Sequence, residues 1–120
     1  MILKEVEIEE KGLLIRINQI YRDTIGDLSL YEATRGGWVI GEKRKRVEYA
    51  FAVYKGQIKE VYKIICWYKA GTLEYKTRPI KDVNISGRWE FEGAKADQSV
   101  REKYLNKSVA HYLNKVHLIQ

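Results

Sequence analysis

The chain has 120 residues, enough for one hydrophobic core but too few for two, so we expect a single domain over residues 1–120. Hydrophobic residues make up 45% of the chain, but no apolar run approaches the roughly 20 residues that cross a bilayer, so no membrane partner is expected. The N-terminus is acidic and lacks the pattern of a signal peptide, and the single cysteine, Cys66, leaves no internal disulfide. These features favour a cytoplasmic protein.

The formal net charge of +6 is unevenly distributed along the chain. Residues 1–32 carry four cations and seven anions, a net charge of −3, whereas residues 33–120 carry eighteen cations and nine anions, a net charge of +9. This asymmetry predicts a basic face, and nucleic acid is the most common polyanion that binds such a face. The alternative is that a lysine-rich surface only keeps the protein soluble.

The N-terminal part of the chain predicts an extended arm followed by helices. Residues 2–10 alternate apolar side chains with glutamates, so residues 1–12 are expected to form a short strand or an arm. A second short helix is predicted over residues 30–34, with Ser29 as its cap and the Gly36-Gly37 pair after it. Before it, an amphipathic helix that ends near Gly26 is predicted, because apolar residues recur at helical spacing at Leu13, Leu14, Ile17, Ile20 and Tyr21.

The middle of the chain predicts a β-hairpin over residues 47–68. Large apolar side chains alternate with small or polar ones from Val47 to Tyr54, and Lys55-Gly56 provides a two-residue turn. The return strand is apolar on both faces near its end, where Cys66 is expected to be buried.

Alternating patterns further along predict a third strand over residues 73–77 and a fourth over residues 89–92. Asp97 is a candidate cap for a helix over residues 98–105, and residues 108–113 are expected to add a further helical turn. The expected fold class is therefore α+β, with N-terminal helices, a curved antiparallel sheet or small barrel, and a C-terminal helix.

The clearest charge feature is the sequence EKRKR at residues 42–46, directly before the hairpin. Cationic side chains on a loop bind the phosphates of nucleic acid without selecting a sequence. The alternative is that the loop only prevents the neighbouring strand from pairing with other chains. Four adjacent cations exceed what edge protection needs, so we expect phosphate contacts from Lys43, Arg44, Lys45 and Arg46.

A second motif, TRGGW at residues 34–38, combines two glycines with a guanidinium and an indole. Glycines allow the main chain to approach a ligand closely, Arg35 is a candidate for a phosphate or base edge, and Trp38 is a candidate for stacking on a base. The alternative for Trp38 is a plug at the open end of the sheet.

Among the other aromatic residues, Trp67 and Trp89 are expected in the core, because both lie on apolar strand faces. Tyr49 and Tyr54 lie near the basic loop and the hairpin turn and are the better candidates for a surface aromatic. These tyrosines complete the expected binding residues.

No catalytic, metal or cofactor motif is found. His111 and His117 are six residues apart, which is not the i, i+4 spacing that puts two metal ligands on one face of a helix. There is no phosphate-binding P-loop and no dinucleotide fingerprint. We therefore expect neither a metal nor a cofactor.

Three segments, LYEATRGGW, VEYAFAVYKGQIKEVYKI and RWEFEG…REKYLNKSVAHYL, together resemble a small family of uncharacterised prokaryotic modules that occur in nuclease and restriction-type contexts. The resemblance covers residues 28–113 and extends more loosely to the PUA-like superfamily (PUA, ASCH, EVE, YTH and SRA-type domains). It implies a small PUA-like pseudobarrel that binds RNA, DNA or a modified base in an aromatic-lined cleft. Arg35, Trp38 and the strand from Tyr49 to Tyr54 are the positions that it marks. The final residues, NKVHLIQ, differ from the polar tail of that family.

The sequence therefore favours a non-enzymatic module that binds nucleic acid through a basic loop and an aromatic cleft for an exposed or modified base. A first alternative is a protein–protein interaction or regulatory module of phage or defence origin, whose basic face binds an acidic partner. A second alternative is a nuclease whose catalytic site the sequence does not reveal.

Overall fold

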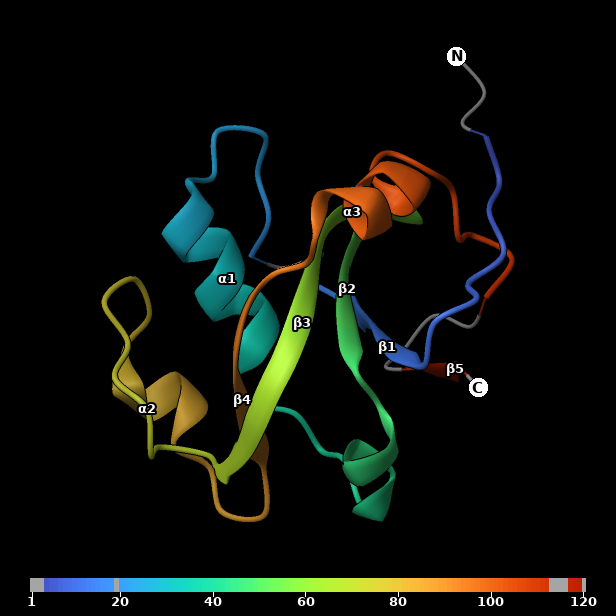
Figure 1. Ribbon diagram of the computed structural model, residues 1–120. Helices are drawn as coiled ribbons and strands as arrows, with labels where there is room; N and C mark the ends of the chain where they lie inside the picture. The colour runs from blue at the N-terminus through green and yellow to red at the C-terminus, as the bar shows by residue number, and fades with distance from the viewer. Residues whose placement is uncertain (1–3, 19, 113–116, 120) are drawn as a thin grey trace.

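A computed structural model describes residues 4–18, 20–112 and 117–119, which form a small α+β domain (Figure 1). Its centre is an open, mixed sheet of five strands in the order β4-β3-β2-β1-β5. The elements in chain order are β1 (Gly12–Arg16), α1 (Asp27–Arg35), the 3-10 helix η1 (Glu42–Arg46), β2 (Tyr49–Tyr54), β3 (Gln57–Lys69), α2 (Ile80–Val83), β4 (Trp89–Lys95), α3 (Gln98–Tyr104) and β5 (His117–Ile119). No helix in the described part of the chain is long and apolar enough to span a membrane.

The predicted N-terminal helix is wrong, because its first residues form β1. This strand pairs in parallel with β2 and antiparallel with β5, so it lies inside the sheet. Leu13 and Ile15 pack on one face of the sheet and Leu14 on the other, and each is at most 2% exposed. A strand buried on both faces has a continuous apolar run rather than an alternating one, and over so few residues that run resembles one side of a helix. The parallel pair makes the sheet mixed rather than antiparallel.

The predicted hairpin is confirmed. β2 and β3 pair antiparallel from Tyr54↔Gln57 to Tyr49↔Lys63, with a register shift between Ala52 and Val53. Lys55 and Gly56 both have positive φ angles, 48° and 79°, as a two-residue turn of this kind requires.

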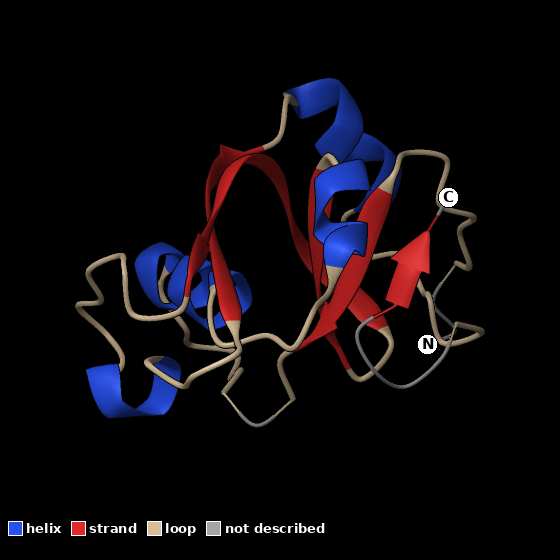
Figure 2. Cartoon of the chain, turned by 90° about the horizontal axis from the view of Figure 1, so that it is seen from below, coloured by secondary structure: helices blue, strands red, loops and turns tan. Residues whose placement is uncertain are grey.

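The two faces of the sheet carry separate halves of the core. On one face α1 covers a cluster that includes Ala50, Ala52 and Phe91, to which it contributes Leu30 and Ala33. On the other face α3 and the N-terminal arm cover a cluster of buried residues, all at most 7% exposed: Ile8, Leu14, Phe51, Val53, Ile58, Val61, Ala96, Tyr104 and Val109. Figure 1 and Figure 2 show the two helices on opposite sides of the sheet.

The C-terminal part of the chain confirms two predictions and corrects a third. The strand predicted over residues 89–92 is β4, and α3 begins directly after Asp97. The additional helix expected over residues 108–113 is absent from residues 108–112, which form a bridge and turns, and residue 113 lies outside the described residues.

Two residues near the start of α1 have positions other than those that the sequence predicted. Gly26, which was expected to end a helix, precedes the first residue of α1, and its carbonyl oxygen accepts a bond of 3.0 Å from the amide of Leu30. Ser29 is inside the helix rather than at its cap. The helix ends at Arg35, directly before the Gly36-Gly37 pair, as the sequence indicated.

The third predicted strand, over residues 73–77, does not form. These residues belong to the β3–β4 connection, which also contains α2 and passes beside the C-terminal end of α1 (Figure 1). Cys66, which was expected to be buried, is exposed, because β3 continues past the start of β2 and is shifted in register between Ile64 and Cys66.

Candidate nucleic-acid interface

A pocket of about 420 Å³ lies where the end of β1, the Gly36-Gly37 turn and the β3–β4 connection meet. We call it the Trp38 pocket. Its charged lining residues are three arginines and one aspartate, and its apolar lining includes Ile17 and Ile20 in addition to the indole. The pocket thus combines an aromatic ring with excess positive charge. Its charged residues are Arg16, Arg78, Asp82 and Arg88.

Trp38 is fixed in the pocket wall by hydrogen bonds at both its side chain and its main chain. The indole Nε1 donates a bond of 2.6 Å to the carbonyl of Thr34 in the last turns of α1. The main chain of Trp38 exchanges two bonds, of 3.0 and 2.9 Å, with Trp89 at the start of β4. The indole is partly exposed, so Trp38 contributes both to the packing beneath α1 and to the lining of a surface pocket, and its stacking on a base stays a prediction.

Two of the pocket arginines bind the glycine turn. Arg88 donates a bond of 3.1 Å from Nη1 to the carbonyl of Gly37. Arg78 donates from Nη1 to the carbonyls of Glu32 and Gly36, at 3.0 and 3.4 Å. Burial is the main reason why the pKa of Arg78 is lowered, although it stays high enough for the guanidinium to remain charged. Both guanidinium groups therefore lie beside the Gly36-Gly37 turn.

The glycine pair is required by packing as well as by backbone conformation. A Cβ atom at Gly36 would collide with the phenol oxygen of Tyr75. Gly37 has a φ of +84°, which disfavours residues with a side chain. The sequence suggested that these glycines admit a ligand, but at Gly36 the close neighbour is Tyr75.

Arg35 does not line the pocket. It is 8% exposed, and its guanidinium carbon lies 5.0 Å from the ring centre of Tyr31 and 4.4 Å from that of Tyr75. It also donates from Nη2 to the carbonyl of Glu74. In this position Arg35 joins α1 to the β3–β4 connection, directly beneath the glycine turn.

Two buried carboxylates hold the same connection and were not identified from the sequence. Glu32, 2% exposed, accepts bonds of 2.8–3.0 Å from the amides of Lys76 and Thr77 and one of 2.7 Å from the Thr77 hydroxyl. Burial alone raises the pKa of Glu32, but these bonds lower it below its ordinary value overall.

Glu90 is fully buried and binds the main chain at the start of the β3–β4 connection, as Glu32 does further along it. It accepts bonds from the amides of Gly71 and Leu73, at 3.1 and 2.5 Å, and from the Tyr75 hydroxyl at 2.8 Å. Burial, followed by this contact with Glu90, raises the pKa of Tyr75. The residues predicted as a strand therefore bond to carboxylates rather than to a sheet. Glu90 alternates with Phe91 in sequence like an outward-facing residue, so no local signal marks it.

The basic segment lies next to the Trp38 pocket. η1 places the guanidinium of Arg44 over the indole of Trp89, 3.6 Å from the ring centre, and Trp89 follows Arg88 in the chain. Lys45 pairs with Glu42 at 2.7 Å, and both groups are exposed. Lys43 and Arg46 are exposed as well, and together with Lys45 they border a hollow of about 650 Å³ with Leu13, Val39 and Ile40.

The two candidate tyrosines lie apart. Tyr49 begins β2 near η1, and the ammonium of Lys63 lies 4.7 Å from its ring centre. Tyr54 ends β2 and packs against Tyr21, with ring centres 4.5 Å apart. The structure therefore brings Trp38 close to the basic segment, and it places Tyr54 at the other end of β2, where its partner Tyr21 follows the pocket residue Ile20.

The two tryptophans expected in the core are both only partly buried. Trp67 packs edge to face against Phe91, with ring centres 5.4 Å apart, and its buried Nε1 has no hydrogen-bond partner among the described residues. Trp89 lies beneath Arg44 at the surface instead.

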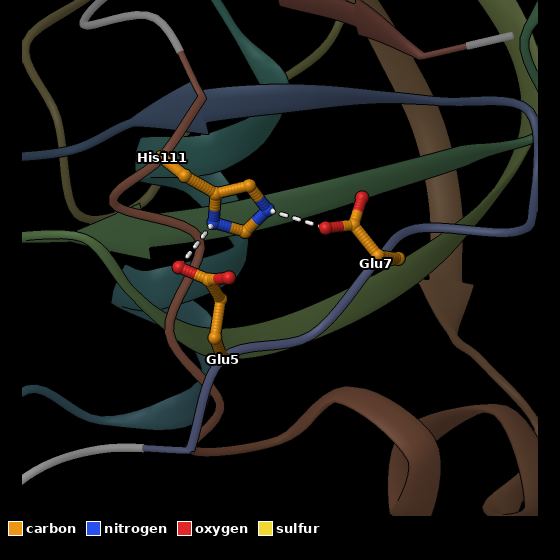
Figure 3. Close-up of side chains that lie close together, drawn as sticks. All are labelled: Glu5, Glu7 and His111. Atoms are coloured by element: carbon orange, nitrogen blue, oxygen red, sulfur yellow. Dashed lines mark ion pairs between the residues drawn. The ribbon is translucent and has the colours of Figure 1, made fainter.

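A second group of titratable side chains joins the N-terminal arm to the C-terminal segment (Figure 3). The two ring nitrogens of His111 face Glu5 at 3.3 Å and Glu7 at 3.2 Å. The sequence predicted no metal-binding group, but donor atoms of these three residues lie within 4.8 Å of one another. All three are exposed, and the contacts among them are sufficient to explain their arrangement as a link between the two segments.

In comparisons with known proteins, no family model, no curated protein and no solved structure matches the chain. The relation to PUA-like domains therefore stays a prediction.

Proposed function

We propose that this chain is a nucleic-acid-binding module in which the Trp38 pocket receives one nucleotide and η1 contacts neighbouring phosphates. The observation that carries the proposal is the presence of three arginines and one tryptophan in the lining of a single pocket of about 420 Å³. Guanidinium groups bind phosphate oxygens in a bidentate manner, and an indole face stacks on any base. The pocket thus offers partners for both ends of a nucleotide.

The basic segment extends this pocket toward the adjoining nucleotides. Arg44 lies on Trp89, whose main chain pairs with that of Trp38, so η1 and the pocket are joined through the edge of β4. The cations of η1 are suited to phosphates outside the pocket, where they set the position of the strand without selecting its sequence. A phosphate at η1 would compete with Glu42 for Lys45, at little cost because that ion pair is exposed.

Arg35 has a supporting role in this proposal. Its buried position between Tyr31 and Tyr75 removes it from the surface but fixes the connection that carries Arg78 and Asp82. Tyr49 stays a candidate for contact beside η1, and Tyr54 stays a candidate on the side of the Trp38 pocket that Ile20 lines, because it packs against the adjacent Tyr21.

One observation favours a second candidate, the binding of an acidic protein. Val39 is 73% exposed at the edge of the hollow between η1 and Ile40. A peptide with carboxylates and one apolar side chain would satisfy both the cations and this apolar surface.

A titration on one protein sample distinguishes the two candidates. We expect a fluorescein-labelled single-stranded oligonucleotide to bind with rising anisotropy and to quench tryptophan fluorescence, and we expect a labelled polyglutamate of equal charge to bind more weakly. Trp38→Phe is the matched control for quenching, since Phe stacks but does not emit in the tryptophan range. Equal or tighter binding of polyglutamate would favour the acidic-protein candidate and overturn the nucleic-acid proposal.

A further inference from the structure

We propose that the Trp38 pocket selects guanine and that Asp82 is the residue that recognises it. This inference rests on the proposed function of the same pocket. Asp82 is the single acidic residue in a lining that contains three arginines, and phosphate binding does not explain its presence there.

The position of Asp82 is determined by the backbone of the β3–β4 connection. Its amide donates a bond of 3.0 Å to the carbonyl of Pro79, and its own carbonyl is the atom closest to where a Cβ at Gly37 would lie, at 4.0 Å. Arg78 and Asp82 both line the pocket. Within residues 4–18, 20–112 and 117–119, however, no cation lies within ion-pair distance of the Asp82 carboxylate.

A carboxylate among the lining residues of this pocket opposes the binding of a phosphate but suits a base. An ionised carboxylate only accepts hydrogen bonds. It would repel a phosphate bound in the same part of the pocket, whereas it would accept the N–H groups of a base that stacks beside Trp38. In this proposal Asp82 contacts the base, and the arginines include the groups that receive the phosphate.

Guanine is the base whose edge matches a carboxylate. Its N1–H and N2–H₂ groups lie side by side and donate to the two carboxylate oxygens together. Adenine and cytosine each offer one amino group beside a ring nitrogen that accepts, and thymine or uracil offers one N–H between two carbonyl oxygens. In each of these bases an acceptor would face the carboxylate. The O6 and N7 atoms of guanine, in turn, are the acceptors that arginine prefers, and Arg78 and Arg88 share the pocket with Asp82.

The experiment uses labelled oligothymidine strands that differ at one central base: guanine, inosine, adenine or cytosine. We expect the guanine strand to bind roughly 5- to 150-fold more tightly than the adenine and cytosine strands, the range given by one bidentate base contact. The inosine strand should bind with intermediate affinity, because inosine keeps N1–H and lacks the 2-amino group.

Asp82→Asn should abolish the preference for guanine and leave the binding of the other strands equal or slightly tighter. Asp97→Asn is the matched control, since it removes the same charge at the start of α3 and should keep the preference. A urea melt shows whether each variant is folded. Equal affinities for all four strands, or an unchanged preference in folded Asp82→Asn, would overturn the role of Asp82 while leaving nucleic-acid binding intact. Absence of binding to every strand would overturn the proposed function itself.

Discussion

Arg88 donates a hydrogen bond of 3.1 Å from its guanidinium to the carbonyl oxygen of Gly37. This bond joins the start of β4 to the turn that follows α1, and the main-chain pairing of Trp38 with Trp89 continues the same contact. An indole and a guanidinium from distant parts of the chain are thereby held at one pocket.

Replacing Trp38 should weaken binding and stability by separable amounts. Trp38→Ala should reduce the affinity for single strands by about 1–3 kcal/mol, the value of one base–aromatic stack. It also removes the donor to Thr34, so the free energy of unfolding should fall. Trp38→Phe should keep much of the affinity, because a smaller ring still stacks. Anisotropy titrations and urea melts on the same samples separate the two effects, and normal binding by the folded fraction of Trp38→Ala would make Trp38 only a packing residue.

Neutralising η1 should weaken binding to all sequences alike. In the triple variant Lys43→Ala, Lys45→Ala and Arg46→Ala the exposed cations are removed, while Arg44 keeps its position on Trp89. Affinity should fall equally for strands of different sequence, because phosphate contacts carry no sequence information. Stability should change little, since these side chains are exposed. An unchanged affinity in anisotropy titrations would show that η1 does not contact the nucleic acid.

Glu90→Gln should destabilise the domain. The carboxylate accepts three hydrogen bonds in a fully buried position, and an amide satisfies fewer of those donors. Leaving a buried donor without a partner costs about 1–3 kcal/mol. Glu92→Gln, two residues along the same strand and exposed, is the control and should change stability by less than about 0.5 kcal/mol. Urea melts measure both variants, and equal midpoints would contradict the role given to Glu90.

Glu32 should make stability depend on pH in the acid range. Its pKa is lower in the folded chain than its ordinary value of about 4.3, so its ionisation stabilises the fold above that pH. This contribution is lost as the pH falls through the lower folded value. The free energy of unfolding should therefore decrease more steeply below about pH 4.3 in the wild type than in Glu32→Gln. Parallel pH profiles of the two proteins would contradict the prediction.

The elements that the sequence predicted correctly depend on local patterns. The hairpin follows from alternation and the Lys55-Gly56 turn, β4 from alternation after residue 88, and α3 from its start after Asp97. The incorrect predictions concern segments whose structure is determined by contacts with residues far away in the sequence. The five residues of β1 become a strand because β2 and β5 pair with both of its edges, and residues 73–77 become a loop because Glu32 and Glu90 bind their main chain.

The candidate site was predicted in part for the same reason. Gly36, Gly37 and Trp38 line a pocket, and their motif marked this turn in the sequence, although the binding role of Trp38 stays a prediction. The three arginines that complete the pocket come from β1 and the β3–β4 connection, and isolated arginines in a basic chain carry no signal. Arg35 was predicted to bind from the same local motif but is buried instead. Its burial depends on Tyr75, forty residues further along the chain.

The salt dependence of binding to a single strand tests the central claim most directly. Each single-strand phosphate contact should contribute about 0.7 to the slope of log affinity against log salt concentration. We predict a clearly negative slope for the wild type, reduced by up to about 0.7 in Arg16→Ala, which removes an exposed cation of the pocket. Lys4→Ala, in the N-terminal arm, is the control and should keep the wild-type slope. A wild-type affinity that does not change with salt, or equal slopes in all three proteins, would contradict a phosphate-binding pocket at Trp38.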